Sequence, residues 1–471
     1  MKRSPGLSLV LDAVRESLIS SSGAVLLNET VRVAGVDRLL AAALAPWRSD
    51  RVVHDPGKVL LDVATAVALG GDCLADLAVV RAQPELFGPV ASDPTVSRVI
   101  AKLAADIDAS LPAIRDARAR ARASIWGRRS PLRSTTGGGS DKDSGRVVVD
   151  LDATLVSAQS DKEHAEPTFK KTFGFAPMCA FVDHGPGGTG EALALDLRPG
   201  KASPHASADH ITTLGNALEQ LGEAERSRVL VRADTGGCSK AFMHHITDLG
   251  LEYSIGFPAM DTVAVALAAI PRQAWRSALD ADENPREGAQ VAELTAWMPT
   301  PTKPTRSPAR FGPQHWPEDM RIIARRERPH PGAQLRLTDH QGWRITCFAT
   351  NTKRGRIADL EVRHRLRARA EDRIRGLKDT GMRNLPFHGY AQNQIWLEIV
   401  ALAADLLTWT QTLAFTANEP ARRWEPKRLR LRILAVAGRI IRTGRRRRLR
   451  LPRDWPYNPL IESGWTALRT T

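Results

Sequence analysis

Hydrophobic positions change their spacing near residue 145. Before it, apolar residues recur at helical intervals between Pro and Gly breaks, which predicts a helical N-terminal domain over residues 1–125. An Arg-Ala run (RDARARARAS) then leads into SPLRSTTGGGSDKDSG, which has no apolar period, so we expect the chain from about Ala113 to be a linker, flexible over residues 126–145. The arginines of that run would contact phosphates or form a solvated helix face.

After residue 145, short apolar runs rich in β-branched residues alternate with helical stretches, which predicts an α/β domain. The expected order over residues 146–257 is strand, strand, strand, helix, strand, helix, strand. The expected strands are Arg146–Leu151, Met178–Asp183, Glu191–Arg198, Arg228–Arg232 and Glu252–Phe257, with helices at Ala206–Gly222 and Ser239–Leu249. The loop HGPGGTGE lacks the Lys-Ser/Thr of a P-loop and is predicted to be a plain turn.

Residues 258–350 interrupt this order as a strand-rich insertion, and helical periodicity returns over residues 351–418. The insertion's predicted strands are Arg321–Arg326, Gln334–Leu337 and Trp343–Phe348. Helices are expected at Asp359–Lys378 and Tyr390–Phe415. The second of these is apolar but contains Glu398 and Asp405, which predicts a buried helix and not a membrane span. Residues 419–471 form a basic C-terminal tail able to bind phosphates nonspecifically.

The predicted helix Asp359–Lys378 places four polar side chains together. At about 100° per residue, they fall on one arc beside the apolar arc of the helix. These four are His364, Arg367, Glu371 and Lys378. The neighbouring acid Asp372 points about 100° away from Glu371, toward solvent. Taken alone, this stretch is typical of an Arg-rich surface helix with one salt-bridged glutamate.

Composition indicates a globular protein with an anionic partner. The 471 residues carry 67 Lys and Arg against 52 Asp and Glu, a formal net charge of +15, and such a balance is typical of proteins that bind anionic polymers. The four cysteines include no C-x-x-C pair, so we expect no zinc ribbon or disulfide framework. With an apolar N-terminal run too short for a signal peptide, we expect a cytoplasmic, nucleoid-associated protein without a membrane partner.

One N-terminal helix suits DNA recognition. Ser92–Asp106 begins with Ser92 as N-cap and Pro94 in the first turn, and it presents Arg98 and Lys102. Cations near a helix N-terminus suit the major groove. The preceding connection is longer than the turn of a helix-turn-helix, and a plain helical bundle is the alternative.

Two acids follow predicted strands at equivalent places. Asp152 ends the first strand and Asp234 follows the fourth, and side chains at the carboxyl ends of strands in an open α/β sheet meet in one crevice. Glu371, on a helix packed across the sheet, would complete the cluster. Three carboxylates together require divalent cations, and oxygen ligands favour Mg²⁺ or Mn²⁺. Two such ions can activate a water and stabilise the leaving oxygen of a phosphodiester.

This arrangement resembles the RNase H-like core of DDE transposases, from about residue 55 to 450. Bacterial insertion-sequence transposases with a Y-R-E-K signature, the insertion-sequence 1380-like group, carry Tyr, Arg, Glu and Lys at the spacing of His364, Arg367, Glu371 and Lys378. VVVDLDATLVS and VLVRADTGG are similar to that branch's two Asp motifs, and SDPTVSR to its N-terminal domain. In the first of these motifs, the family usually has Asp-x-Thr, and this form identifies Asp152, not Asp150, as the family's aspartate. His364 departs from the family's Tyr; a histidine can stack or bond a phosphate, and it ordinarily titrates near neutrality.

The resemblance implies an RNase H-like mixed sheet (β-β-β-α-β-α-β-α) and DNA strand cleavage and transfer. Asp152, Asp234 and Glu371 would hold two Mg²⁺ or Mn²⁺ ions. His364, Arg367 and Lys378 would contact phosphates of the transposon end. The N-terminal helices would recognise the terminal inverted repeats of double-stranded DNA, and a homodimer would join two ends in a synaptic complex before target DNA is attacked.

Three other functions remain open from the residues. A DNA-binding regulator without catalysis would need only the basic tail and the N-terminal helices. A metal-dependent nuclease would cleave DNA without strand transfer. A zinc hydrolase would use His205, His210, His244 or His245, although no H-E-x-x-H motif occurs.

Overall fold

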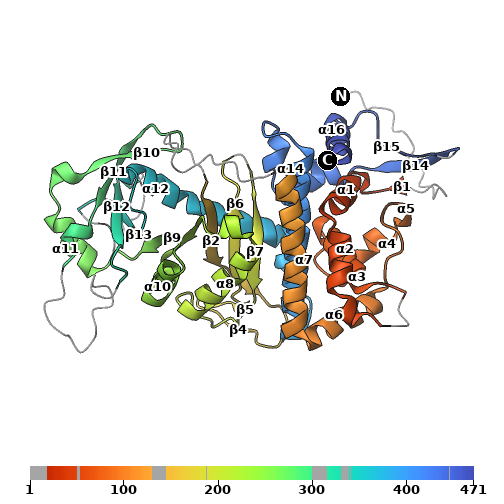
Figure 1. Ribbon diagram of the computed structural model, residues 1–471, viewed down its shortest axis with the longest axis horizontal. Helices are drawn as coiled ribbons and strands as arrows, with labels where there is room; N and C mark the ends of the chain where they lie inside the picture. Colours follow the sequence, from red (N-terminus) through yellow and green to blue (C-terminus); the bar gives the residue numbers. More distant parts are fainter. Residues whose placement is uncertain are drawn as a thin grey trace, which may run out of the picture.

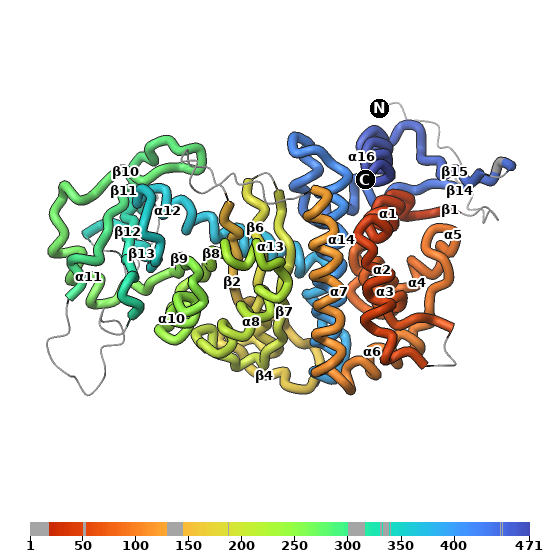
Figure 2. The backbone as a smooth tube through the Cα atoms, in the orientation of Figure 1, coloured from red at the N-terminus to blue at the C-terminus, as the bar shows by residue number. Residues whose placement is uncertain are grey.

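The computed structural model describes residues 18–49, 53–129, 145–186, 188–299, 316–329, 332, 339, 341–444 and 446–471. The molecule is elongated: a block of helices lies at one end, a large sheet crosses the middle, and the strands of the insertion form the other end (Figure 1). The tube view shows the C-terminal segment lying against the N-terminal helices (Figure 2).

Five strands form the centre of a nine-stranded sheet, and all five were predicted from the sequence. They are β2 (Val147–Ala153), β6 (Met178–Asp183), β7 (Gly190–Asp196), β8 (Val229–Ala233) and β9 (Glu252–Phe257). Their spatial order is β7-β6-β2-β8-β9. β6 runs antiparallel to both of its neighbours, whereas β2, β8 and β9 are parallel. The predicted mixed α/β sheet is therefore present.

The insertion extends this same sheet instead of forming a separate module. It contributes β10 (Arg276–Leu279), β11 (Pro285–Glu293), β12 (Arg321–Glu327) and β13 (Arg344–Thr350), each antiparallel to the next. β13 then pairs with β9, with Cys347 opposite Phe257. The predicted strand Gln334–Leu337 lies outside the described residues.

Helices cover both faces of the central strands. One face packs on α8 (Ser207–Glu219) and α10 (Lys240–Asp248), whose apolar residues share a core with those of β2 and β8. The other face packs on α13 (Arg369–Leu377), whose Ala370, Ile374 and Leu377 share a core with Cys179 and Phe181 of β6. Shorter elements complete this part: β3 (Val156–Ser157), β4 (Glu166–Pro167), β5 (Phe173–Phe175), α9 (Glu223–Arg226) and α11 (Asp261–Ala269).

The N-terminal helices surround the apolar helix α14 (Tyr390–Ala414), which matches its predicted range. They are α1 (Val25–Ala34), α2 (Val36–Ala43), α3 (Pro56–Ala68), α4 (Leu77–Arg81), α5 (Pro84–Phe87) and α6 (Asp93–Ala105). Trp396 and Trp409 of α14 are completely buried in the shared core. In the part of the chain that the structure describes, no helix is long and apolar enough to cross a membrane.

The predicted linker from Ala113 is wrong over its first part, because residues 107–128 form the helix α7 (Ile107–Arg128). Arg115, Arg118 and Arg122 stand three and four residues apart and are buried on one face. Arg118 contacts Glu398 at 2.7 Å and Asp405 at 3.0 Å, and both acids lie on α14. Paired in this way, the arginines are part of the interior and not a solvated face. Residues 130–144 of the predicted linker lie outside the described residues.

The C-terminal segment is folded and does not form a simple tail. It contains α15 (Pro426–Leu429), β14 (Gly438–Thr443), β15 (Arg446–Arg450) and α16 (Asn458–Thr470). β14 and β15 form an antiparallel hairpin, and β1 (Leu18–Ile19) pairs with the free edge of β14. The basic residues of this segment are therefore presented by a strand pair attached to the N-terminal helices.

Candidate active site

Asp152 and Asp234 lie side by side at the ends of two parallel strands. The last paired residues of β2 and β8 are Leu151 and Ala233, and each acid directly follows one of them. Asp234 also begins a short 3-10 turn, where its Oδ1 accepts a hydrogen bond of 2.8 Å from the backbone N–H of Gly236. Because the strands are parallel and in register, both carboxylates stand at the same edge of the sheet.

Arg367 connects this edge to Glu371. Its Nη1 lies 3.4 Å from Asp152 Oδ2, and its Nη2 lies 3.5 Å from Glu371 Oε1. Glu371 is in the first turn of α13, and its side chain is 66% exposed. The neighbouring acid Asp372 forms an ion pair with Arg375 instead, at 2.5 Å. The helix therefore directs Glu371, and not Asp372, toward Asp152.

The three acids influence one another. Burial is the largest cause that raises the pKa of Asp152 to about 6, and the negative charge of Asp234 is the next. Arg367 opposes this rise, and Glu371 adds to it. Negative charges beside the Asp152 carboxylate disfavour its ionised form, and a bound cation would relieve this repulsion.

The donor set fits a hard divalent cation. Carboxylate oxygens from two strand ends and one helix are the ligands that Mg²⁺ and Mn²⁺ prefer. The oxygens of the three acids are not all within 4.8 Å of one another, and Glu371 is the most exposed of the three. Asp150 is unsuitable because it is fully buried and held by Arg232 at 2.6 Å.

The one tight group of ligand atoms within the described ranges is Asp72, Cys73 and Asp76. It has a structural explanation, since Asp76 Oδ2 accepts hydrogen bonds from the backbone N–H groups of Asp72 and Cys73 at 2.8 and 3.2 Å. Such a capping arrangement satisfies the free N–H groups of a helical turn. No histidine belongs to a group of this kind among the described residues, so the zinc hydrolase alternative has no supporting site there.

His364 occupies a different environment from the one expected. Its ring stacks on Phe348, with centroids 4.5 Å apart and planes 7° apart, and its Nδ1 lies 3.0 Å from Ser254 Oγ. Burial, followed by the charges of Arg367 and Arg232, lowers the pKa of His364 to about 3. The expectation of titration near neutrality is therefore wrong, because packing against Phe348 and the nearby arginine charges disfavour the protonated ring.

The predicted continuous helix is broken beside His364. The chain forms α12 (Ile357–Arg365), a 3-10 turn over Leu366–Ala368, and then α13. A 3-10 turn advances about 120° per residue where an α-helix advances about 100°. Over three residues this adds about 60°, which rotates His364 away from the arc of Glu371.

Lys378 lies near the acids, whereas Arg98 and Lys102 do not. Burial lowers the pKa of Lys378, and the nearby Cys179 thiol opposes this effect. Cys179 of β6 lies directly opposite Asp152 of β2, so Lys378 lies close to the strand that carries Asp152. Arg98 and Lys102 are exposed on α6, and Lys102 Nζ donates to the Trp47 carbonyl at 3.0 Å. α6 belongs to the helical block, away from the central strands (Figure 1).

Arg369 and Arg373, on the other side of α13, were not predicted as part of the site. Both contact Asp183, at 3.2 and 2.7 Å. Burial alone would raise the pKa of Asp183, but these guanidinium groups and Arg232 lower it to about 2. The two arginines are four residues apart, on the side of the helix opposite Glu371. This spacing is the sequence signal that could have identified their contact with Asp183.

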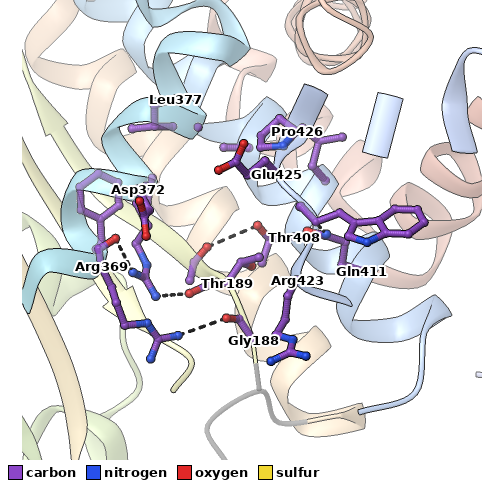
Figure 3. Close-up of a pocket in the computed structure, with 18 of the residues that line it drawn as sticks. Gly188, Thr189, Arg369, Asp372, Leu377, Thr408, Gln411, Arg423, Glu425 and Pro426 are labelled. Carbon is purple, nitrogen blue, oxygen red and sulfur yellow. Dashed lines mark hydrogen bonds between the residues drawn. The ribbon is translucent and has the colours of Figure 1, made fainter. Parts of the chain in front are cut away.

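The same two arginines line a cavity of about 310 Å³ behind α13. Its wall includes Gly188 and Thr189 of the loop before β7, residues of α14 and the segment Arg423–Pro426 (Figure 3). Asp152, Asp234 and Glu371 are not among its lining residues. The cavity therefore lies beside the helix that carries Glu371 and is separate from the acid cluster.

Comparison with known proteins agrees with the sequence motifs at the level of family. No curated protein matches the sequence. A cryo-EM structure of the piggyBac transposase synaptic complex with hairpin DNA is similar with a TM-score of 0.40 and 8% identity, over 88% of this chain and 80% of that chain. Similarity at this level does not establish a common fold. The family described as "Transposase DDE domain group 1" matches residues 5–471. The chain therefore belongs to this family of DDE transposases.

Proposed function

We propose that this protein is the transposase of a bacterial insertion sequence with the Y-R-E-K type of active site, which cuts DNA at the terminal inverted repeats and joins the ends to target DNA. Family membership supports a DNA-cutting transposase. The observation that supports the finer proposal is that Arg367 contacts both Asp152 and Glu371, while the charge of Asp234, at the end of the neighbouring strand, acts on Asp152.

The proposal includes an RNase H-like catalytic core. Counted in chain order, the five central strands β2, β6, β7, β8 and β9 are strands 1 to 5, and they lie side by side in the order 3-2-1-4-5. Of these, only strand 2 (β6) runs antiparallel to strand 1 (β2). Helices α8 and α10 follow the third and fourth strands, and the later helix α13, which packs on the sheet, carries Glu371. This topology supports the proposal because it brings the first and fourth strands next to each other at the centre.

Asp152, Asp234 and Glu371 would hold two Mg²⁺ or Mn²⁺ ions. When bound, such ions activate a water and stabilise the leaving oxygen of an in-line phosphodiester displacement. The carboxylates of Asp152 and Asp234 are already oriented by strand register, and Glu371 would close the site from the exposed side. Burial, followed by the charge of Asp234, raises the pKa of Asp152, and cation binding would relieve the charge repulsion.

Arg367 and Lys378 are suited to hold phosphates of the transposon end. The two contacts of Arg367 are long for ion pairs, at 3.4 and 3.5 Å, so its guanidinium can exchange a carboxylate for a phosphate at little cost. Lys378 is a partly buried cation beside the same strands. His364 would act by holding the 3-10 turn between α12 and α13 in place, because its ring stacks on Phe348.

The remaining roles follow from the family resemblance. The helical domain of residues 1–125 would recognise the terminal inverted repeats, with Arg98 and Lys102 exposed on α6. A homodimer would hold two transposon ends in one synaptic complex.

The decisive experiment measures nicking of a duplex that carries the element's end, with Mg²⁺ present. Asp152→Ala, Asp234→Ala and Glu371→Ala should each abolish nicking while end binding is retained. Asp372→Ala is the matched control, because it removes an adjacent, exposed acid that pairs with Arg375, and it should nick like wild type. Unchanged nicking by all three acid variants would refute the catalytic assignment. Absence of nicking by the wild-type protein, with end binding retained, would favour a DNA-binding regulator.

Strand transfer is tested separately from cleavage. Duplexes with pre-cut 3′-hydroxyl ends are incubated with a supercoiled target, and joined products are measured. Joining that depends on the same three acids supports a transposase. Cleavage without any joining would support the alternative of a metal-dependent nuclease.

A further inference from the structure

The hairpin of β14 and β15 carries an unusual density of positive charge. From Gly438 to Arg453 the sequence contains eight arginines and no acidic residue. On β15, Arg446, Arg447, Arg448 and Arg450 are all exposed. In Figure 1 the hairpin projects from the helical block, at the end of the molecule opposite the insertion. We refer to residues 438–450 as the arginine ribbon.

The register of the ribbon places like charges directly opposite each other. Arg439 faces Arg450, and Arg442 faces Arg447. Like charges at directly opposite positions destabilise an antiparallel pair. Glu85 of α5 relieves one of them, with an ion pair to Arg442 at 3.3 Å. Charged side chains on an edge strand can protect it from aggregation, but that purpose does not require arginines placed directly opposite each other.

We propose that the arginine ribbon binds the phosphate backbone of duplex DNA by entering a groove. A two-stranded antiparallel ribbon fits the major groove. Side chains alternate between the two faces of a strand, so Arg446, Arg448 and Arg450 lie on one face and Arg447 on the other. A ribbon in a groove has a phosphate strand on each side, and it would use arginines on both faces. Arginine also binds phosphate through two parallel hydrogen bonds, which lysine cannot form.

The position of the ribbon links it to the N-terminal helices. Leu18 pairs with Arg439 through β1, and Glu85 of α5 contacts Arg442. The ribbon therefore extends the surface of the domain proposed to recognise transposon ends, far from the acid cluster. It rests on the proposed function only in taking DNA as its partner. A membrane-binding arm would present exposed apolar or aromatic side chains, whereas Ile440, Ile441 and Leu449 are partly buried.

The test uses the full-length protein with Arg446→Gln, Arg448→Gln and Arg450→Gln combined. Glutamine keeps a polar side chain that can hydrogen-bond, although a shorter one, and removes the charge. Binding to an unrelated duplex is measured without divalent metal over a series of salt concentrations. Each lost phosphate contact lowers the slope of log Kd against log salt by about 0.9, so we expect a decrease of about 2.7. Thermal unfolding should be unchanged or shifted upward, because the repulsion between Arg439 and Arg450 disappears.

The control removes the same charge from the opposite end of the molecule. Arg272→Gln, Arg276→Gln and Lys353→Gln are combined, since all three side chains are exposed near the insertion. The control should keep nearly the wild-type slope. An unchanged slope in the ribbon variant, or an equal loss in the control, would overturn the proposal. Preferential loss of binding to anionic vesicles or to single-stranded RNA would also overturn it.

This design separates the ribbon from the proposed function. Wild-type protein that fails to bind duplex DNA at all would contradict the transposase proposal itself. Wild-type binding that the ribbon variant fully retains would contradict only the ribbon, and nicking by the acid cluster would remain to be judged by its own variants.

Discussion

Replacing Arg118 with methionine tests whether the buried ion network of α7 holds the helical block to the sheet. Arg118 is completely buried. Its guanidinium donates to Glu398 Oε2 at 2.7 Å, to Asp405 Oδ2 at 3.0 Å and to the carbonyl of Ala192 on β7 at 2.7 Å. Its Nε also donates to Asp405 Oδ2, at 3.1 Å. Methionine keeps an unbranched but shorter side chain and removes the charge and all four hydrogen bonds.

The expected loss of stability follows from the acids that remain. Glu398 keeps Arg115 at 2.8 Å, and Asp405 keeps Arg122 at 3.0 Å. Removing one member of a buried ion pair costs about 3–5 kcal/mol, because the other charge remains buried without compensation. Since each acid retains one guanidinium, we expect Arg118→Met to lower the free energy of unfolding by about 3 kcal/mol, the lower end of that range.

Urea denaturation measures this difference, and the same helix provides the control. Arg120 is 62% exposed and lies 3.7 Å from Asp116, so Arg120→Met should change the free energy of unfolding by less than about 0.5 kcal/mol. Adding Asp405→Asn to Arg118→Met should recover part of the loss, because it removes a buried charge that has lost a partner. A loss below about 1 kcal/mol for Arg118→Met would refute the view that this network is essential for stability.

Three further substitutions or titrations have expected outcomes. Gly190→Ala should destabilise the fold by more than about 2 kcal/mol in urea denaturation, because the new Cβ would overlap Arg373 Nε and lie 2.6 Å from the Val182 carbonyl oxygen. Its control is Gly250→Ala, which is also at positive φ but in open space and should cost about 1 kcal/mol. The His364 ring should remain neutral by NMR between pH 8 and 5. Its contribution to stability should be full above about pH 6.5 and should fall as the pH decreases toward the pKa of His364, about 3. Protonation of the ring near pH 6.5 would contradict the observed packing. Asp76→Ala should cost about 1 kcal/mol of stability through the lost cap and leave Mg²⁺-dependent nicking unchanged, whereas altered metal dependence would show that the Asp72 cluster binds the metal.

The central strands were predictable because their signal is local. Met178–Asp183 is apolar and is bounded by a proline before it and a glycine-rich loop after it, and β6 has the same ends. The extension of the sheet by the insertion was not predictable in the same way. It depends on β13 pairing with β9, about ninety residues earlier in the chain, and periodicity carries no information about which edge a strand joins.

Helix α7 shows where residue type misleads. A helical stretch in which arginine alternates with alanine, as in RDARARARAS, is usually solvated. Whether such a face is buried depends on acids elsewhere, here Glu191 on β7 and Glu398 and Asp405 on α14. The sequence shows Glu398 and Asp405 as acids inside an apolar helix, but the pattern of residues does not identify their partners.

The candidate site was predictable where it depends on short-range geometry. Strand register places Asp152 beside Asp234, and one residue of helical rotation separates Glu371, beside Arg367, from Asp372, beside Arg375. His364 lies across the 3-10 turn from Glu371, and the added rotation moves it off the shared arc. A break of three residues is decided by packing, and the sequence of this stretch contains no Pro or Gly to indicate it.

Net charge pointed to a DNA partner without indicating where it binds, because arginine serves three purposes in this chain. In α7 it is buried and neutralised by acids, as at Arg118. At the candidate active site Arg367 spans two carboxylates through long contacts that a phosphate could replace. In the ribbon, Arg446, Arg447 and Arg448 are exposed on a strand without acidic residues. Only the last two kinds leave positive charge available to DNA, so burial and partners, more than the formal total of +15, determine where DNA would be held.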